Sequence, residues 1–303
     1  MHAENPCEPG YWQSLQELPE LVDATIDESP LDPLPPASAS YKIKREGSLL
    51  LSKDSEEELI FLKGVGEYYE VSVSLFYHSD SFSGILRKVE ENHLNLVRLF
   101  VNVGHLDNPN YLSAFSRTTT YHPRDYNSDY FSKLNNFLAE ADSRNIYVIL
   151  SLFDMSSELD DDYAGSAWNP NNNDHALLIG PPLGNPKNDF FSGAFSSGGV
   201  DGLSELGRLQ RDYVLKVVRE TRRNENVIYE IVNEPNCDPV YEPDLRLWIN
   251  FIALVIKQGW GGCTGAESYL TTVTNSKRRG LNLYQNPIFP SAVGTPVGTP
   301  TVI

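Results

Sequence analysis

The sequence predicts an α/β fold built on a parallel sheet, because strand patterns and helix patterns alternate along it with a regular rhythm. The strand candidates are short, near-continuous apolar runs, typical of parallel strands covered on both faces. The helix candidates space their apolar residues at intervals of three and four. With 303 residues, 40% of them hydrophobic, the chain is long enough for one large domain with a sizeable core.

The first elements expected are a hairpin and the first strand of the sheet. Apolar runs at 41–43 and 49–51, separated by Arg45-Glu46-Gly47, predict a short hairpin that closes the bottom of the domain. Residues 59–62 are the first strand candidate. A helix is expected to open near Asp80 or Ser81.

The remaining elements are expected in strand–helix pairs. Strands are predicted at 96–101, 146–152, 227–232 and 269–273, and helices at 128–143, 202–223 and 243–257. The Gly/Pro/Ser-rich segment 155–200 is predicted to be a long loop, and long loops inside compact domains are usually functional.

Two parallel architectures fit this pattern, a doubly wound sheet and a (β/α)8 TIM barrel. A doubly wound dinucleotide-binding sheet needs a glycine-rich turn after its first strand, and the chain offers only Gly64-Val65-Gly66 there. Polar and aromatic residues instead gather after the carboxyl ends of the strands, where barrels place their chemistry. We therefore predict a TIM barrel, of which the first five or so strand–helix units can be recognised.

The charge and its distribution suggest the domain limits and exclude some partners. A net charge of −17 argues against nucleic acid and anionic membranes as partners. Residues 1–40 are expected to be an acidic, proline-containing, disordered tail, 41–285 an incomplete TIM-barrel domain and 286–303 a low-complexity tail. We see neither a secretory signal nor a stretch long enough to span a membrane, so the compartment stays open. Three widely spaced cysteines imply no disulfide framework.

The strand at 227–232 leads directly into Asn233-Glu234-Pro235, which places a glutamate at the tip of a buried strand. Side-chain alternation predicts that Glu230 and Glu234 face one side and Asn233 the other. A buried Glu230 needs a partner, and Arg98 is the natural counter-charge. Two roles are open for Arg98: it forms an ion pair that only stabilises the barrel, or it orients a catalytic carboxylate. Two are also open for Glu234: it takes part in catalysis, or it caps the following helix.

Three segments resemble the clan A glycoside hydrolases, in particular the cellulase- and mannanase-like family five. They are the strand at 61–66, the segment Asn95-Leu-Val-Arg-Leu-Phe100, and 227–235 with its Asn-Glu-Pro, within a resemblance over roughly 41–280. The resemblance implies retaining hydrolysis of O-glycosyl bonds in a β-linked oligo- or polysaccharide. Glu234 would be the general acid/base, Asn233 would bind the sugar 2-hydroxyl, and Arg98 would support the nucleophile. Proteins of this family are often secreted, so the resemblance implies that an extracellular location is common.

Further substrate contacts are predicted from residue type and place. Trp168 is a candidate platform for sugar stacking, with ordinary loop packing as the alternative. His78 and His105, each just past a strand, either line a subsite or pack in their loops. The six histidines show no metal-ligand spacing, and no phosphate-binding loop occurs, so we expect no metal or cofactor.

The second catalytic carboxylate is the missing part of this prediction. The resemblance implies a nucleophilic glutamate at the tip of the seventh strand, but only 68 residues follow Pro235. Glu242 and Glu267 are the only later glutamates, and neither is at a matching place. We therefore expect a C-terminally incomplete hydrolase; the alternatives are a non-catalytic carbohydrate-binding pseudoenzyme and a barrel completed by a second chain. An NAD-dependent oxidoreductase would require the absent glycine fingerprint.

Overall fold

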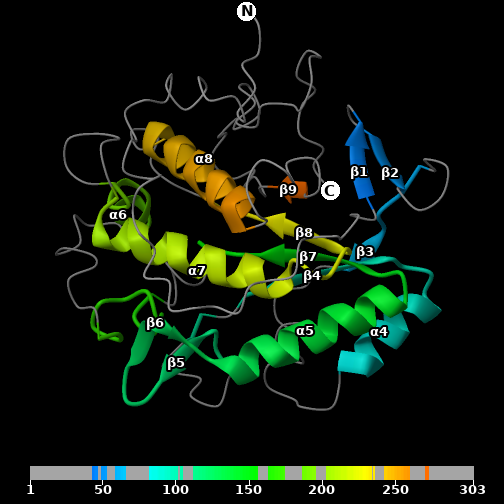
Figure 1. Cartoon of the computed structure of the whole chain (residues 1–303), viewed down its shortest axis with the longest axis horizontal. Helices are drawn as coiled ribbons and strands as arrows, with labels where there is room; N and C mark the ends of the chain where they lie inside the picture. Colours follow the sequence, from blue (N-terminus) through cyan, green and yellow to red (C-terminus); the bar gives the residue numbers. More distant parts are fainter. Residues whose placement is uncertain are drawn as a thin grey trace, which may run out of the picture.

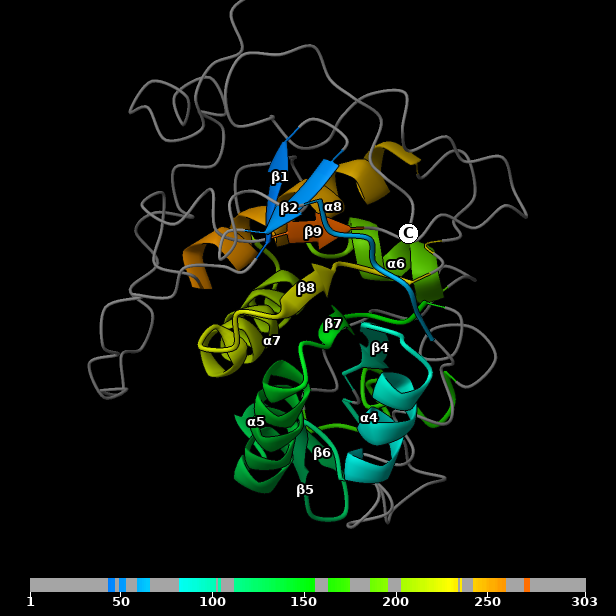
Figure 2. The ribbon, with the colours of Figure 1, turned by 90° about the vertical axis from the view of Figure 1, so that its right-hand side faces the viewer.

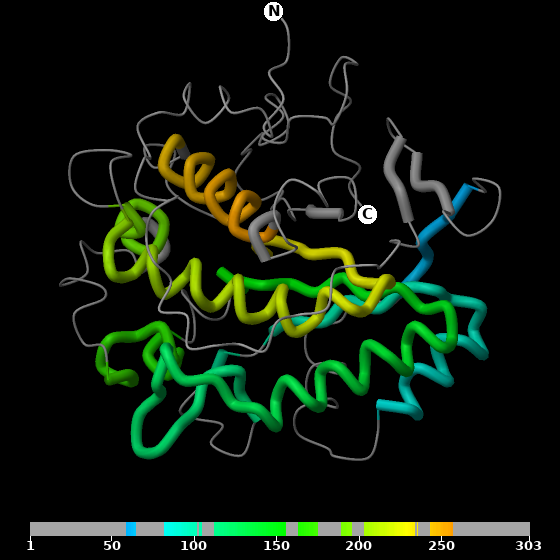
Figure 3. The backbone as a smooth tube through the Cα atoms, in the orientation of Figure 1, coloured from blue at the N-terminus to red at the C-terminus, as the bar shows by residue number. Residues whose placement is uncertain are grey.

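The structure, a computed structural model, describes most of the central part of the chain (Figure 3). The described residues are 43–46, 49–52, 59–65, 82–101, 103–104, 112–155, 163–174, 186–195, 203–233, 235, 242–259 and 270–272. The two tails expected at 1–40 and 286–303 lie outside these ranges, as do the three cysteines.

A parallel sheet of five strands forms the centre of the described part (Figure 1). Its strands are β3 (Gly64–Val65), β4 (Leu96–Phe100), β7 (Tyr147–Ser151), β8 (Val227–Glu230) and β9 (Leu270–Thr272). They neighbour one another in the order of the chain, without the reversal that a doubly wound sheet makes at its switch point. This order confirms the barrel prediction: the described strands are consecutive strands of a TIM barrel.

Four helices follow one another around one face of this sheet (Figure 2). They are α4 (Phe82–Glu91), α5 (Ser128–Ser143), α7 (Glu205–Thr221) and α8 (Glu242–Gly259). Each packs on the next, α4 on α5, α5 on α7 and α7 on α8. The outer ring of a TIM barrel is built in this way, and the four helices predicted from apolar spacing are confirmed.

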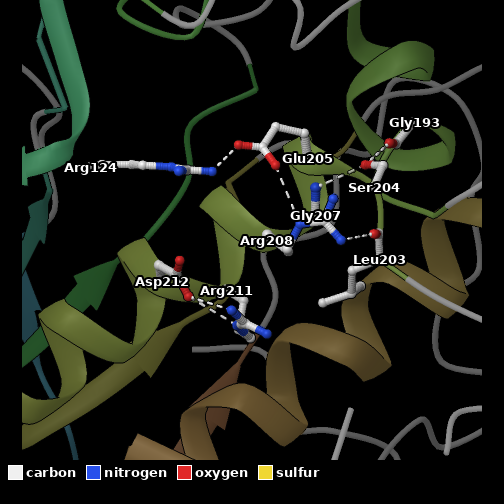
Figure 4. A network of polar contacts seen from close by, with 9 residues as sticks. All are labelled: Arg124, Gly193, Leu203, Ser204, Glu205, Gly207, Arg208, Arg211 and Asp212. Atoms are coloured by element: carbon white, nitrogen blue, oxygen red, sulfur yellow. Dashed lines mark hydrogen bonds and ion pairs between the residues drawn. The ribbon is translucent and has the colours of Figure 1, made fainter. Parts of the chain in front are cut away.

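The helix starts are set by local capping. The Asn127 side chain accepts a hydrogen bond from the Asp129 amide at the start of α5, and Ser204 accepts one from the Gly207 amide at the start of α7, each at 3.0 Å. The Ser204 hydroxyl also donates to the Gly193 carbonyl, and Arg124 reaches Glu205 from a neighbouring strand (Figure 4). The start of α7 is therefore fixed by contacts with two earlier segments of the chain, one at Gly193 and one at Arg124.

Five smaller elements complete the described part. The antiparallel pair β1 (Ile43–Glu46) and β2 (Leu49–Ser52) confirms the predicted hairpin. A second hairpin, β5 (Phe115–Arg117) and β6 (Tyr121–Tyr126), and the short helix α6 (Pro186–Ser192) were not predicted. The sequence of β6, YHPRDY, has a central proline and two charges, so it shows no strand pattern.

The first barrel strand lies later than expected. Residues 59–62 were predicted to form it, but the ladder with β4 consists of Gly64 and Val65. The earlier residues are held beside β4 by Asn95 instead. Its amide donates to the Phe61 carbonyl at 2.9 Å, and its side-chain oxygen accepts from the Lys63 amide at 2.8 Å.

The two faces of the sheet differ in character. The face under the helices belongs to the large apolar core. On the opposite face, Leu96, Ile149 and Ile228 form a small separate cluster from three neighbouring strands. One step further along each strand this inner face becomes polar, and the polar layer positions the candidate site.

Candidate active site

The polar layer of the inner face consists of Arg98 on β4, Ser151 on β7 and Glu230 on β8. These residues lie two positions beyond Leu96, Ile149 and Ile228, so side-chain alternation places them on the same face. Ser151 and Glu230 are register partners in adjacent strands. Ser151 and Glu230 are the last residues of their strands, where barrel proteins place their chemistry, and Arg98 reaches Glu230 from the middle of β4.

Arg98 and Glu230 form a two-pronged ion pair across the sheet. Arg98 Nε donates to Glu230 Oε2 at 2.8 Å, and Arg98 Nη2 donates to Oε1 and Oε2 at 2.7 and 2.6 Å. Glu230 is 1% exposed, and the guanidinium lies 4.6 Å from the centre of the Phe100 ring. Arg98 is thus the counter-charge that the strand pattern predicted.

Burial raises the pKa of the Glu230 carboxyl, and the charge and hydrogen bonds of Arg98 oppose this shift. The nearby Asp154 carboxylate raises the pKa of Glu230 further. A carboxyl so deep in the sheet is a supporting group rather than one that meets a ligand.

Asn233 extends the network toward the mouth of the barrel. Arg98 Nη2 donates to Asn233 Oδ1 at 2.8 Å, so the guanidinium contacts both Glu230 and Asn233. The two readings of Arg98 left open by the sequence are therefore not exclusive: it closes a buried ion pair and also holds a side chain next to Glu234 in the sequence.

The predicted alternation beyond Glu230 is wrong, because Glu230 and Asn233 contact the same guanidinium. The regular ladder of β7 and β8 stops at the pair Ser151–Glu230 and resumes at the pair Asp154–Asn233, in the same register. Residues 152–153 and 231–232, between these two pairs, lie outside the regular strands, and strict side-chain alternation need not hold across them.

Asp154 is a site residue that the sequence analysis did not single out. Asn233 Nδ2 donates to Asp154 Oδ1 at 2.9 Å, and Asp154 is 4% exposed. The Met155 amide donates to the Asn233 carbonyl at 3.2 Å, and the Asn233 amide to the Phe153 carbonyl at 2.9 Å. The available signal was an acidic residue just past a predicted strand, the same position that Glu234 has after its own strand.

Trp168 does not form a platform for sugar. It is 1% exposed, and its ring packs edge-on against the rings of Phe115, Phe190 and Tyr213. Both faces of the indole are therefore within the apolar core. The alternative of ordinary packing is the one observed.

The asparagine-rich part of the predicted functional loop is structural where it is described. Asn172 Nδ2 donates to the carbonyls of Ala164 and Ser166, and Asn173 Nδ2 to those of Ala167 and Asn169. Both side chains are buried. They satisfy backbone carbonyls in a segment without regular secondary structure.

Other predicted site residues lie outside the described residues. These are Glu234, His78 and His105, together with the downstream Glu267. Glu242 begins helix α8, as expected. In the described ranges no three His, Cys, Asp or Glu residues gather as metal ligands, and no helix has both the length and the apolar character to cross a bilayer.

Parallel strands in chain order, an outer ring of helices and a polar network at the strand ends define a barrel protein of the (β/α)8 class. Comparison with known families then identifies the chain more closely. It belongs to the cellulase family, glycosyl hydrolase family 5, whose family model matches residues 67–258. A search of curated proteins found no significant match.

Solved structures agree at the level of the fold. An endo-1,4-β-mannanase from Rhizomucor miehei is 15% identical, with a TM-score of 0.50, over 78% of this chain and 62% of that chain. A family 5 mannosidase from the same organism is 16% identical, with a TM-score of 0.51, over 78% and 56%. An endo-β-1,4-mannanase from Thermotoga petrophila is 13% identical, with a TM-score of 0.50, over 74% and 45%. This chain spans less than two thirds of each.

Proposed function

We propose that this protein hydrolyses O-glycosyl bonds in a β-linked oligo- or polysaccharide with retention of configuration. Glu234 is the general acid/base, first protonating the leaving oxygen and then activating water. Asn233 binds the sugar 2-hydroxyl. Arg98 holds the residues around it in place.

The observation that carries the proposal is the hydrogen-bond network around Asn233. Asn233, which directly precedes Glu234 in the sequence, is bound through its oxygen by Arg98 and through its nitrogen by Asp154. A buried amide held on both sides is a preorganised hydrogen-bonding group, the kind of feature that fixes a substrate relative to an acid. Family membership supplies the reaction class that such a group serves.

Retaining cleavage needs a second carboxylate ~5–5.5 Å from the first. We propose no residue for it, because neither of the glutamates after Glu234 is at a strand tip in the predicted pattern. The retaining outcome is therefore tested directly through its product.

The test compares the wild-type chain with Glu234→Ala on aryl β-glucosides and aryl β-mannosides. Loss of the acid/base lowers turnover by about 10²- to 10⁴-fold. Added azide attacks the glycosyl–enzyme intermediate without needing a base, so it restores turnover of Glu234→Ala and yields a β-glycosyl azide. Glu220→Gln is the matched control, because Glu220 pairs with Lys216 on helix α7, away from the site.

Two results would count against the proposal. An α-configured azide product would reject retention, and equal turnover by Glu234→Ala and the wild type would reject the role of Glu234. If the wild-type chain binds β-linked oligosaccharides but turns over none, the alternative of a carbohydrate-binding pseudoenzyme is supported.

A further inference from the structure

We infer that Asp154 is a positioning residue of this site, which locks the Asn233 side-chain amide in the orientation that offers an N–H to the substrate. This inference rests on the proposed function, in which Asn233 binds the sugar 2-hydroxyl. Asp154 follows the neighbouring strand β7, and neither the Asn-Glu-Pro motif nor the strand pattern gave it a role.

The two partners of the Asn233 side chain have opposite hydrogen-bonding chemistry. A guanidinium can only donate hydrogen bonds, and an ionised carboxylate can only accept them. Arg98 faces the amide oxygen at 2.8 Å, and Asp154 faces the amide nitrogen at 2.9 Å. Turning the amide over would place N–H against the guanidinium and oxygen against the carboxylate, so only one of the two orientations is satisfied.

This orientation leaves one N–H group of the Asn233 amide available to a substrate. An amide nitrogen carries two N–H groups. Among the described residues, Asn233 Nδ2 donates to Asp154 alone. The other N–H is therefore free to donate to a hydroxyl of a bound sugar, whereas an inverted amide would present its carbonyl oxygen instead.

Asp154 lies just beyond strand β7, next to the segment that carries Asn233. The paired backbone of 151–155 and 230–233 sets Asp154 directly opposite Asn233, in the same register as the strands below. At 4% exposure the Asp154 side chain is covered, and its carboxylate accepts a hydrogen bond from the Asn233 side-chain amide. Asp154 thus acts through Asn233 and is not itself a catalytic residue.

The experiment measures discrimination at the sugar 2-position. The probes are aryl β-glucoside, aryl β-mannoside and aryl 2-deoxy-β-arabino-hexoside, which is the 2-deoxy counterpart of both. Turnover and binding by titration calorimetry are measured for the wild type, Asp154→Ala, Asp154→Asn and Asp212→Ala. Asp212 is a matched control, because its carboxylate accepts from Arg211 at 2.9 Å on helix α7.

For each variant, the measured quantity is the ratio of turnover, or of binding, between the preferred 2-hydroxy sugar and the 2-deoxy sugar. In Asp154→Ala this ratio is expected to fall by about threefold to tenfold, which corresponds to the loss of one hydrogen bond. Asp154→Asn keeps an acceptor oxygen and should stay close to the wild type, as should Asp212→Ala. A general loss of structure would lower all three probes together and leave their ratio unchanged. If Asp154→Ala does not fold, Asp154→Ser replaces it, since its hydroxyl is polar but too short to reach the amide.

Each outcome separates this inference from the proposed function. An unchanged 2-hydroxy to 2-deoxy ratio in a folded Asp154→Ala or Asp154→Ser overturns the role of Asp154 and leaves the proposed function intact. If the wild type neither binds nor cleaves any of the three probes, the proposed function fails, and the inference fails with it.

Discussion

Arg98 serves two neighbours at once, and its chemistry explains why an arginine stands there. Its planar fork satisfies both oxygens of Glu230, and the same Nη2 group also reaches Asn233. A lysine ammonium is a point charge and would not reproduce this geometry. Removing Arg98 would leave Glu230 buried without its counter-charge, which is costly.

Arg98→Met is therefore expected to lower the free energy of unfolding by about 3–5 kcal/mol. The double variant Arg98→Met/Glu230→Gln should recover much of that loss, because the unpaired charge is gone. Urea denaturation monitored by circular dichroism measures both. Arg144→Ala is the control, since Arg144 pairs with Glu90 and Glu140 at the surface and should cost about 1 kcal/mol or less. Equal losses in Arg98→Met and Arg144→Ala would contradict the prediction.

A second prediction at the residue scale concerns pH. Burial raises the pKa of Glu230 above its ordinary value of 4.5, so the folded state binds this proton more tightly than the unfolded state. The resulting stability is fully present below about pH 4.5 and is lost as the pH rises through the folded pKa. Glu230→Gln stays neutral and lacks this dependence. Unfolding free energies from pH 4 to 8 should therefore fall in the wild type relative to Glu230→Gln; a relative rise would show that pairing with Arg98 outweighs burial.

At the scale of elements, the rim beside the site is assembled from three separate segments. The Ala167 amide donates to the Gly104 carbonyl after β4, and the Tyr121 amide on β6 donates to the Asn172 carbonyl, each at 2.9 Å. His122 and Asp174 add a side-chain link at 2.7 Å. Gly104 after β4, the β5–β6 hairpin and the segment 163–174 are thus joined to one another.

Gly104 is the tightest point of these joined segments. Its φ of +129° disfavours any side chain, and a Cβ would collide with the Tyr121 ring. Gly104→Ala should lower the free energy of unfolding by about 2 kcal/mol. Gly84→Ala is the matched control: it lies in helix α4 with open space around it and should raise stability by about 0.5–1 kcal/mol. Thermal denaturation tests the pair, and a shift of both in the same direction would be the contrary result.

At the scale of the whole molecule, β4, β7 and β8 form the centre of the sheet, with strands paired on both sides. Opening any of them exposes core on the helix face and polar groups on the inner face. Their amides should exchange with deuterium at least about tenfold more slowly than those of the β5–β6 hairpin, because local opening costs less than global unfolding. Mass spectrometry of peptic fragments resolves the two regions, and faster exchange in β7 than in β6 would refute this ranking.

The amino-acid pattern alone predicts the parallel sheet, four helices and the pairing of Arg98 with Glu230. Apolar periodicity reflects burial within each element, and a buried carboxylate needs a counter-charge wherever the sheet places one. The β5–β6 hairpin and α6 were missed, because contacts with other segments hold them rather than a pattern of their own.

Which side chains meet at the strand ends follows from the packing of the two strands against each other. Side-chain alternation holds while a strand is regular, and it fails where the regular pairing of β7 and β8 is interrupted, between Ser151 and Asp154 and between Glu230 and Asn233. Beyond that interruption Asn233 contacts the same guanidinium as Glu230, and Asp154 lies opposite it. This arrangement depends on two segments 79 residues apart, so no local pattern in either of them predicts it.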